Sequence, residues 1–134
     1  MIKKELYYLN ILIKMEGFTE LPGTNGNVFK KITKEGISPI QPKTGQKVSV
    51  HYKGYFKDGI VFDQSRKKKK SKPFVFKVGI GEVIKGWDVG VASMKKGESA
   101  TFYIKSDYAY GNEGAGDDIP PNTDLYFDVE LVNC

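Results

Sequence analysis

The sequence contains a single cysteine, Cys134, and a single histidine, His51. One cysteine cannot form an intramolecular disulfide, so the chain fits a reducing compartment such as the cytoplasm. The histidine has no second histidine or cysteine beside it, which argues against a transition-metal site. No apolar run approaches the roughly 20 residues of a transmembrane helix, so we expect no membrane insertion.

Common catalytic motifs are also missing. The sequence has no Gly-x-Ser-x-Gly nucleophile elbow and no phosphate-binding loop that ends in Gly-Lys-Ser/Thr. The segment Gly79-Ile-Gly81 begins like a dinucleotide-binding fingerprint, but Ile84 stands where the third glycine is needed. The acidic residues between 107 and 118 lack the spacing of a calcium loop. Covalent, nucleotide-dependent and metal-dependent catalysis therefore lack support, and we expect no cofactor and no metal.

The formal net charge of +5 comes mostly from one run, Arg66–Lys72, in which six of seven residues are basic. One interpretation is a solvated loop. The other is a nuclear-import or phosphate-contacting patch, which would bind nucleic acid weakly and with a steep dependence on salt. We prefer the solvated loop because such runs are common. The expected localisation is cytoplasmic, and the second interpretation of this run would add the nucleus.

The chain of 134 residues is long enough for one domain with a substantial core. Several segments alternate between apolar and polar residues, as half-buried strands do. The dipeptide Asp58-Gly59 is typical of a hairpin turn between two of them. A glycine-rich loop over 107–122 separates the last two. The predicted strands are 28–32, 46–56, 60–63, 74–78, 98–106 and 124–132.

One helical pattern stands among these strands. Apolar residues recur at three- and four-residue spacing at Val83, Ile84, Trp87 and Val91, which predicts a helix of about two turns. A lone short helix beside alternating strands must lay its apolar face on a sheet. We therefore expect an α+β domain over 21–134, with one helix on the concave face of a five- or six-stranded antiparallel sheet. Trp87 should lie between helix and sheet.

Residues 1–20 form a separate N-terminal extension in this interpretation. Its apolar run, Leu6–Ile13, could belong to a signal peptide, but the run is short, contains Asn10 and is not followed by a cleavage site. Apolar residues at helical spacing would also allow a docking helix, and a poorly ordered tail is the third interpretation. A further hypothesis is that the natural chain begins at Met15.

Aromatic residues are frequent on the predicted strand faces and beside the helix and the long loop. They usually belong to a core. Six of them around one short helix and one long loop could instead line an apolar pocket. These residues are Tyr52, Phe62, Phe74, Trp87, Tyr110 and Phe127.

A series of short segments resembles a known family. Each segment is weak evidence alone, but their order and spacing are specific. Together they resemble the FKBP family of peptidyl-prolyl cis/trans isomerases, the immunophilins that bind tacrolimus and rapamycin. The likeness extends from about Val28 to the C-terminus and implies a twisted half-barrel sheet wrapped around the helix. The segments are Val50–Tyr55, Asp58–Asp63, Lys72–Phe76, Gly81–Trp87, Asp107–Gly111, Ile119–Pro121 and Phe127–Leu131.

The resemblance also implies roles for individual residues. Trp87 would be the floor on which a proline ring rests, and the amide of Ile84 and the hydroxyl of Tyr110 would donate hydrogen bonds to ligand carbonyls. The implied catalytic residues are Tyr52, Asp63, Phe62, Trp87, Tyr110 and Phe127. The implied substrate- or inhibitor-binding residues are Phe74, Glu82, Val83, Ile84 and Ile119.

The implied partners are proline-containing segments of client proteins and macrolides of the tacrolimus and rapamycin type. We expect a monomeric isomerase. The alternative is a binding module or scaffold that docks proline-containing segments with little turnover. Nucleic acid is a less favoured partner, which rests only on Arg66–Lys72.

The sequence departs from the family pattern near the implied pocket. The loop between Asp63 and Pro73 is about two residues longer than in the small family members. The arginine that commonly pairs with the pocket aspartate has no unique counterpart, and Arg66 or one of the lysines at 67–70 could replace it. Asp118 stands where many members carry an apolar residue. A carboxylate at the rim of the pocket is expected to disfavour acidic substrates.

Overall fold

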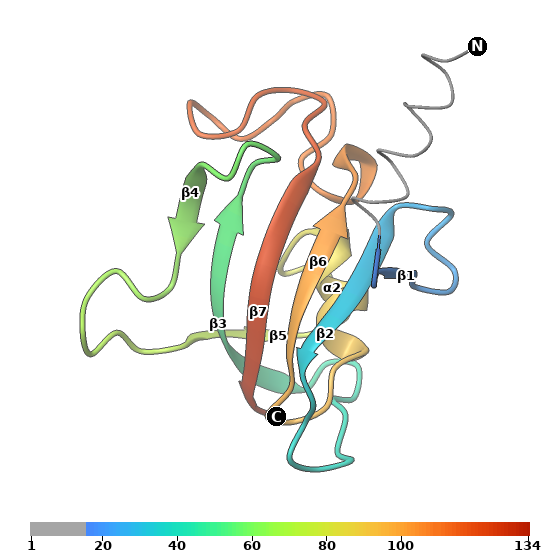
Figure 1. The fold of residues 1–134 in the computed structure, drawn as a ribbon, viewed down its shortest axis with the longest axis vertical. Helices are drawn as coiled ribbons and strands as arrows, with labels where there is room; N and C mark the ends of the chain where they lie inside the picture. The colour runs from blue at the N-terminus through green and yellow to red at the C-terminus, as the bar shows by residue number, and fades with distance from the viewer. Residues whose placement is uncertain (1–15) are drawn as a thin grey trace.

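The computed structural model describes residues 16–134, and Figure 1 shows a single curved sheet with one α-helix against its inner face. The sheet has seven strands in the order β1-β2-β6-β7-β3-β4, and β5 pairs with β3 off this path. The predicted α+β class and antiparallel pairing are confirmed. The elements are β1 (Thr19–Glu20), β2 (Val28–Lys34), β3 (Lys47–Tyr55), β4 (Val61–Gln64), β5 (Phe74–Lys77), α2 (Lys85–Ala92), β6 (Ser99–Ile104), the 3-10 helix η1 (Ser106–Tyr108) and β7 (Leu125–Asn133).

The sheet has one strand more than the six predicted ranges, because β1 has only two residues and no alternation that a pattern could reveal. Thr19 and Glu20 pair with β2, although the sequence analysis assigned them to the N-terminal extension. The interpretations offered for the apolar run before residue 15 lie outside the described residues. Within residues 16–134, no helix is long and apolar enough to cross a membrane.

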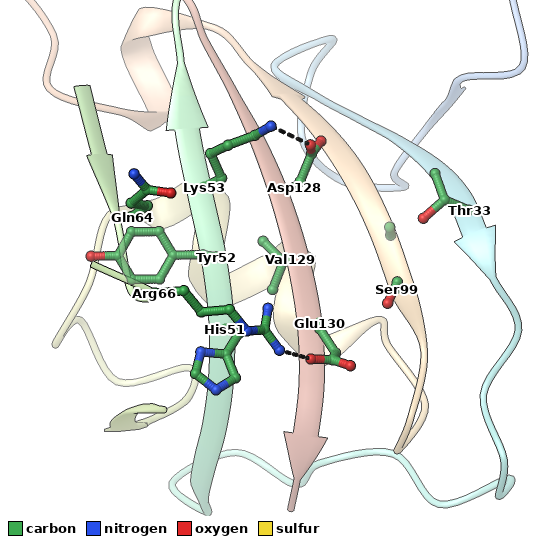
Figure 2. Close-up of a pocket in the computed structure, with 11 residues that line it drawn as sticks. Thr33, His51, Tyr52, Lys53, Gln64, Arg66, Ser99, Asp128, Val129 and Glu130 are labelled. Carbon is green, nitrogen blue, oxygen red and sulfur yellow. Dashed lines mark hydrogen bonds and ion pairs between the residues drawn. The ribbon is translucent and has the colours of Figure 1, made fainter. Parts of the chain in front are cut away.

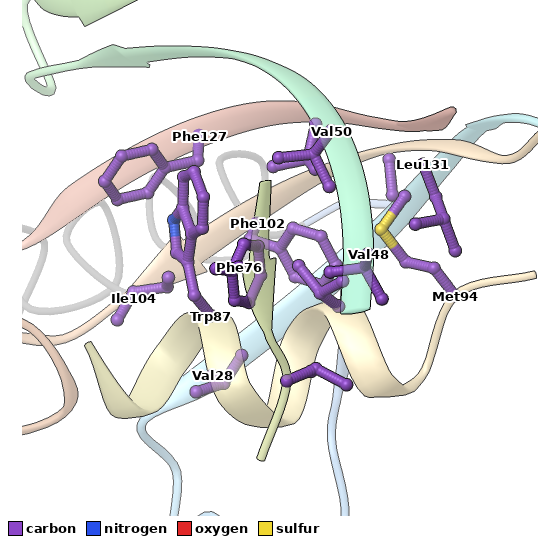
Figure 3. Packing of buried hydrophobic residues seen from close by; sticks show 14 of the residues in the cluster. Val28, Val48, Val50, Phe76, Trp87, Met94, Phe102, Ile104, Phe127 and Leu131 are labelled. Carbon is purple, nitrogen blue, oxygen red and sulfur yellow. The ribbon is translucent and has the colours of Figure 1, made fainter. Parts of the chain in front are cut away.

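The core lies between the inner face of the sheet and α2. The alternation read in β7 is observed, since Leu125, Phe127, Val129 and Leu131 are all buried and the residues between them are half-buried. Figure 3 shows side chains of β3, β5, β6 and β7 gathered above the helix. The pocket described below is one end of this packed layer.

The helix begins later than predicted. Ile84 is the residue that caps its N-terminus, so Val83 and Ile84 precede the helix and do not belong to its apolar face. The buried face is made by Gly86, Trp87, Gly90 and Val91. The glycines allow a close approach: a Cβ on Gly86 would lie 2.5 Å from Ile104.

A buried ion pair ties the end of the helix to the sheet. Lys30 Nζ on β2 lies 2.8 Å from Glu98 Oε2, and both side chains are almost completely buried. The same ammonium group donates to the carbonyl oxygen of Ser93, which follows the last residue of α2, at 3.0 Å. Because α2 carries Trp87, these contacts help fix the position of that ring.

Candidate active site

A cavity of about 430 Å³ opens where the inner face of the sheet meets the start of α2. Four strands, the segment before the helix and the long loop contribute its walls. The structure therefore brings together all the residues that the resemblance assigned to the pocket, with the exception of Ile119. The lining residues are Tyr52, Phe62, Asp63, Phe74, Glu82, Val83, Ile84, Trp87, Tyr110 and Phe127.

Trp87 is held among other aromatic rings, between the helix and the sheet as expected. Its ring centroid lies 4.9 Å from that of Tyr52 and 5.4 Å from that of Phe127, with interplanar angles of 77° and 85°. Such edge-to-face contacts are favourable because they set the positive edge of one ring against the negative face of another. The indole Nε1–H has no hydrogen-bond partner among the described residues. Packing therefore holds the ring, as Figure 3 shows for its contact with Phe127.

Gly54 on β3 leaves room for two aromatic side chains of the cavity wall, Phe62 and Phe127, to pack against the strand. The rings of Phe62 and Phe127 lie edge to face with centroids 5.6 Å apart. A Cβ on Gly54 would lie 2.6 Å from the ring of Phe62 and 2.8 Å from that of Phe127. Any other residue at position 54 would therefore clash with these two rings.

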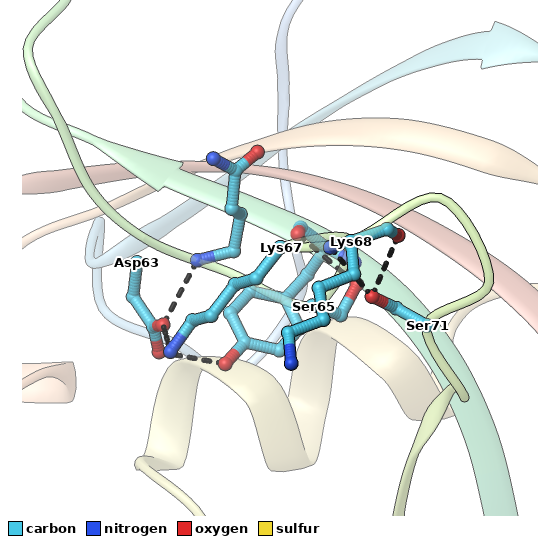
Figure 4. Close-up of polar contacts among 7 residues, drawn as sticks. Asp63, Ser65, Lys67, Lys68 and Ser71 are labelled. Atoms are coloured by element: carbon cyan, nitrogen blue, oxygen red, sulfur yellow. Dashed lines mark hydrogen bonds and ion pairs between the residues drawn. The ribbon is translucent and has the colours of Figure 1, made fainter.

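Asp63 is the centre of a polar network at the wall of the cavity. Its Oδ2 accepts a hydrogen bond of 2.6 Å from the hydroxyl of Tyr52. Lys67 Nζ lies 3.4 Å from Oδ1 of Asp63 (Figure 4). Burial and the bond to Asp63 raise the pKa of Tyr52, so its hydroxyl stays protonated. Arg66 pairs instead with Glu130 at 2.8 Å. Of the alternatives that the sequence left open, Lys67 is the cation beside the pocket aspartate.

The segment before the helix is fixed by its own hydrogen bonds. The amides of Gly79 and Gly81, both in a left-handed conformation near φ +83°, donate to the carboxylate of Asp88 on α2 at 2.8 and 2.9 Å. This arrangement presents Ile84 to the cavity, and its backbone N–H has no hydrogen-bond partner among residues 16–134. A donor is thus available at the wall.

Tyr110 supplies a second available donor. Its hydroxyl makes no hydrogen bond with any other residue that the structure describes, and the ring is 39% exposed at the mouth of the cavity. Burial, with a smaller contribution from the charge of Asp63, raises the pKa of Tyr110. The hydroxyl therefore keeps its proton at neutral pH.

Two residues of the long loop are not among the residues that line the aromatic cavity. Ile119 is 4% exposed and belongs to the core, because its backbone bonds to Ala115 close the loop and turn the side chain inward. Asp118 is exposed and lines a different cavity, of about 540 Å³, between the β3–β4 turn and the loop. It is therefore not part of the aromatic cavity.

A third hollow, of about 400 Å³, lies on the outer face of the sheet (Figure 2). Ion pairs span it, among them Arg66 with Glu130. His51 lines this hollow, is 8% exposed and has its Nδ1 2.9 Å from Ser65 Oγ, so a hydrogen bond holds its ring. Burial and the charge of Arg66 lower the pKa of His51, against a smaller opposing effect of Glu130.

Sequence reasoning missed Ser65, which fixes the backbone of Tyr52. The amide of Tyr52 donates to Ser65 Oγ at 2.8 Å, and the amide of Ser65 donates to the carbonyl of Tyr52 at 3.0 Å. This contact depends on the register between β3 and β4, which no local pattern encodes. Among the described residues, no three His, Cys, Asp or Glu side chains are grouped as a metal site would require.

Comparison with known proteins agrees with this geometry. Residues 38–132 match the family described as FKBP-type peptidyl-prolyl cis-trans isomerase. FK506-binding protein 1 of Dictyostelium discoideum is 52% identical over 101 residues, which are 75% of this chain and 92% of the relative. Peptidyl-prolyl cis-trans isomerase Fkbp12 of Drosophila melanogaster is 54% identical over 97 residues, 72% of this chain and 88% of the relative. Peptidyl-prolyl cis-trans isomerase FKBP4 of Homo sapiens is 44% identical over 119 residues, 89% of this chain but only 26% of that longer protein.

Proposed function

Since the chain belongs to the FKBP-type peptidyl-prolyl cis-trans isomerase family and has its isomerase activity, we propose that the aromatic cavity is the catalytic site. It acts on the X-Pro bonds of client segments without a covalent step. The same cavity binds macrolides of the tacrolimus and rapamycin type. The observation that carries the proposal is the enclosure of Trp87 by the rings of Tyr52 and Phe127 at the base of this cavity.

An isomerase of this kind needs no nucleophile. Rotation about a peptide bond costs about 18–20 kcal/mol because amide resonance is lost, and an uncatalysed X-Pro bond isomerises in roughly tens to hundreds of seconds. The twisted amide has less charge separation than the planar one. A dry aromatic cavity therefore stabilises the twisted state relative to the planar state. Each gain of about 1.4 kcal/mol in this difference increases the rate about tenfold.

The walls of the cavity assign the apolar roles. Among the rings that line the cavity, only Trp87 and Phe127 are buried. Trp87 is the floor beneath the proline ring. The side walls are Tyr52, Phe62, Phe74 and Phe127. Val83 completes the apolar lining at the side of the helix.

The polar roles follow from the available hydrogen-bonding groups. The amide of Ile84 and the hydroxyl of Tyr110 donate to carbonyl oxygens of the substrate or macrolide, since neither is used within the described protein. Glu82 offers a backbone carbonyl. Asp63, held by Tyr52 and Lys67, is the polar group of the wall. Ile119 is buried in the same core cluster as Trp87 and Phe127, and its implied contact with the ligand stays part of this proposal.

Macrolide binding has support from one relative's name and from the shape of the site. The relative from Dictyostelium discoideum is named an FK506-binding protein, and its similarity extends over 75% of this chain. The cavity also combines apolar walls with a few hydrogen-bonding groups, which is typical of small-molecule sites.

The experiment is an X-Pro isomerisation assay, with and without rapamycin, on the wild type and on Tyr110→Phe. We expect full inhibition of the wild type at saturating drug. The variant should bind the drug roughly threefold to tenfold more weakly, because one net hydrogen bond is lost. Its unfolding free energy should not change, because the hydroxyl has no partner within the described protein. Turnover that saturating rapamycin leaves intact would refute the shared cavity.

A further inference from the structure

The aromatic cavity lies between two surfaces of opposite charge, one at each end of β4. Phe62 and Asp63 of this strand line the cavity. The turn before β4 carries Asp58, and the loop after it carries the lysines 67–70. We call these surfaces the acidic rim (Asp58, Asp118 and Asp124) and the basic rim (Lys67–Lys70). Figure 1 shows the turn and the loop at opposite ends of the strand.

The basic rim is a defined turn. The amide of Lys68 donates to Ser71 Oγ at 2.9 Å, and Ser71 Oγ donates back to the carbonyl of Lys68 at 2.8 Å (Figure 4). This closed turn exposes Lys69 and Lys70 at its tip. Its first lysine contacts the carboxylate of Asp63, so the rim begins at the wall of the cavity.

The acidic rim surrounds the cavity of about 540 Å³ beside the aromatic one. Three aspartates line it, and Lys57 is the one basic residue among its lining residues. Asp124 is held in place by the hydroxyl of Tyr103 at 3.0 Å. Asp118 is exposed, and its carboxylate has no ion pair or hydrogen bond with any residue from 16 to 134. A cationic side chain that enters this cavity would therefore meet excess negative charge.

The two cavities share a wall. Phe56 lines the acidic one, and its ring centroid lies 5.0 Å from that of Phe62, which lines the aromatic one. An extended peptide advances about 3.3–3.6 Å per residue. A client with its proline in the aromatic cavity can therefore cross the rings of Phe62 and Phe56 and enter the acidic cavity within roughly three residues. On the other side, Lys67 of the basic rim contacts Asp63 of the cavity wall, so a client that leaves the cavity past Asp63 passes the basic rim.

We propose that the two rims select clients by charge order, with a basic residue on the side of the proline that crosses Phe56 and an acidic residue on the side that meets the lysines. This inference rests on the proposed function of the aromatic cavity. Selection by charge order differs from a simple preference for one charge, because it distinguishes clients of equal net charge. Exposed charge pairs contribute little individually, so the preference should be roughly threefold to tenfold at low salt. It should fall as added salt shortens the screening length.

The test compares two peptides of identical composition. One carries Lys before and Glu after the proline, each about three residues away, and the other has the order reversed. An uncharged peptide is the reference. We expect kcat/KM to differ between the two orders at low salt. The difference should shrink in Asp118→Asn and in the triple variant Lys68→Gln, Lys69→Gln and Lys70→Gln, while the uncharged peptide keeps its rate.

Equal kcat/KM for the two charge orders at low salt would overturn the proposal. So would a difference that survives in both variants. Absence of turnover for the uncharged peptide would count instead against the proposed function of the aromatic cavity. If charge order has no effect but the wild type binds single-stranded DNA and the triple variant does not, the lysines are a nucleic-acid contact and the rims do not select clients.

Discussion

Two tyrosines of β3 illustrate how the position of a residue determines its role. Tyr52 donates to Asp63 at 2.6 Å, and Tyr55 donates to Asp128 at 2.9 Å. Burial raises the pKa of both, with further contributions from the neighbouring aspartate. Tyr52 lines the aromatic cavity, whereas Tyr55 stacks on Tyr126 outside it. The same chemical pair therefore occurs both at the site and away from it.

This duplication supplies a matched control. Tyr52→Phe removes the hydroxyl that holds Asp63 at the cavity wall, and we expect kcat/KM for an X-Pro peptide to fall about tenfold, as the loss of a hydrogen bond to a charged group would cause. Tyr55→Phe removes an equivalent bond outside the cavity and should leave kcat/KM within about twofold. Equal losses in the two variants would show that the hydroxyl of Tyr52 has no specific role in the site.

His51 predicts a pH dependence of stability. Its pKa in the folded protein lies below the ordinary value of 6.5, chiefly because it is buried and secondly because Arg66 is near. The unfolded chain therefore binds more protons than the folded one below about pH 6.5, so the stabilisation from neutral His51 is complete above this pH and is lost as the pH falls.

The measurement is urea unfolding of the wild type and of His51→Asn between about pH 7.5 and about pH 5. Because other groups titrate in both proteins, the informative quantity is the difference between their free energies of unfolding. This difference should decrease towards acid. A difference that is constant over the range would contradict the lowered pKa.

At the scale of elements, alternation in sequence was a reliable guide to strands and a poorer guide to the helix. The buried residues of β7 recur with period two, so burial and sequence pattern agree. Val83 and Ile84 continue the helical pattern of Trp87, yet they are apolar because they line the cavity. A cavity wall and a helix face thus produce the same pattern. The sequence also did not predict that Lys67 lies beside Asp63, because the path of the loop after β4 determines this contact.

The contact between α2 and the sheet gives a prediction for two glycines. A Cβ on Gly86 would lie 2.5 Å from Ile104, and one on Gly90 would lie 3.0 Å from a ring carbon of Phe102. We expect Gly86→Ala to destabilise the protein by about 1–2 kcal/mol, because overpacking outweighs the better helix propensity of alanine. Gly90→Ala should cost less. Thermal or urea unfolding would measure both, and a Gly86→Ala variant more stable than the wild type would refute this account of the packing.

At the scale of the whole molecule, the fold gathers its site from distant parts of the chain. The cavity combines side chains of β3, β4, β5, β7 and α2 with two loops. The resemblance of short segments anticipated most of these residues because the segments follow the family pattern in type and order. It did not anticipate that Ile119 turns into the core or that Asp118 lines a neighbouring cavity, since both depend on how one loop closes on Ala115.

Trp87 is the only tryptophan of the chain, so its fluorescence reports on the aromatic cavity alone. A single titration with rapamycin should therefore follow this fluorescence and X-Pro isomerisation in the same samples. If the cavity is both the catalytic site and the macrolide site, the two curves will share one midpoint, and turnover will fall to the uncatalysed rate when the fluorescence change is complete. Turnover that persists at that point would contradict the assignment of catalysis to this cavity.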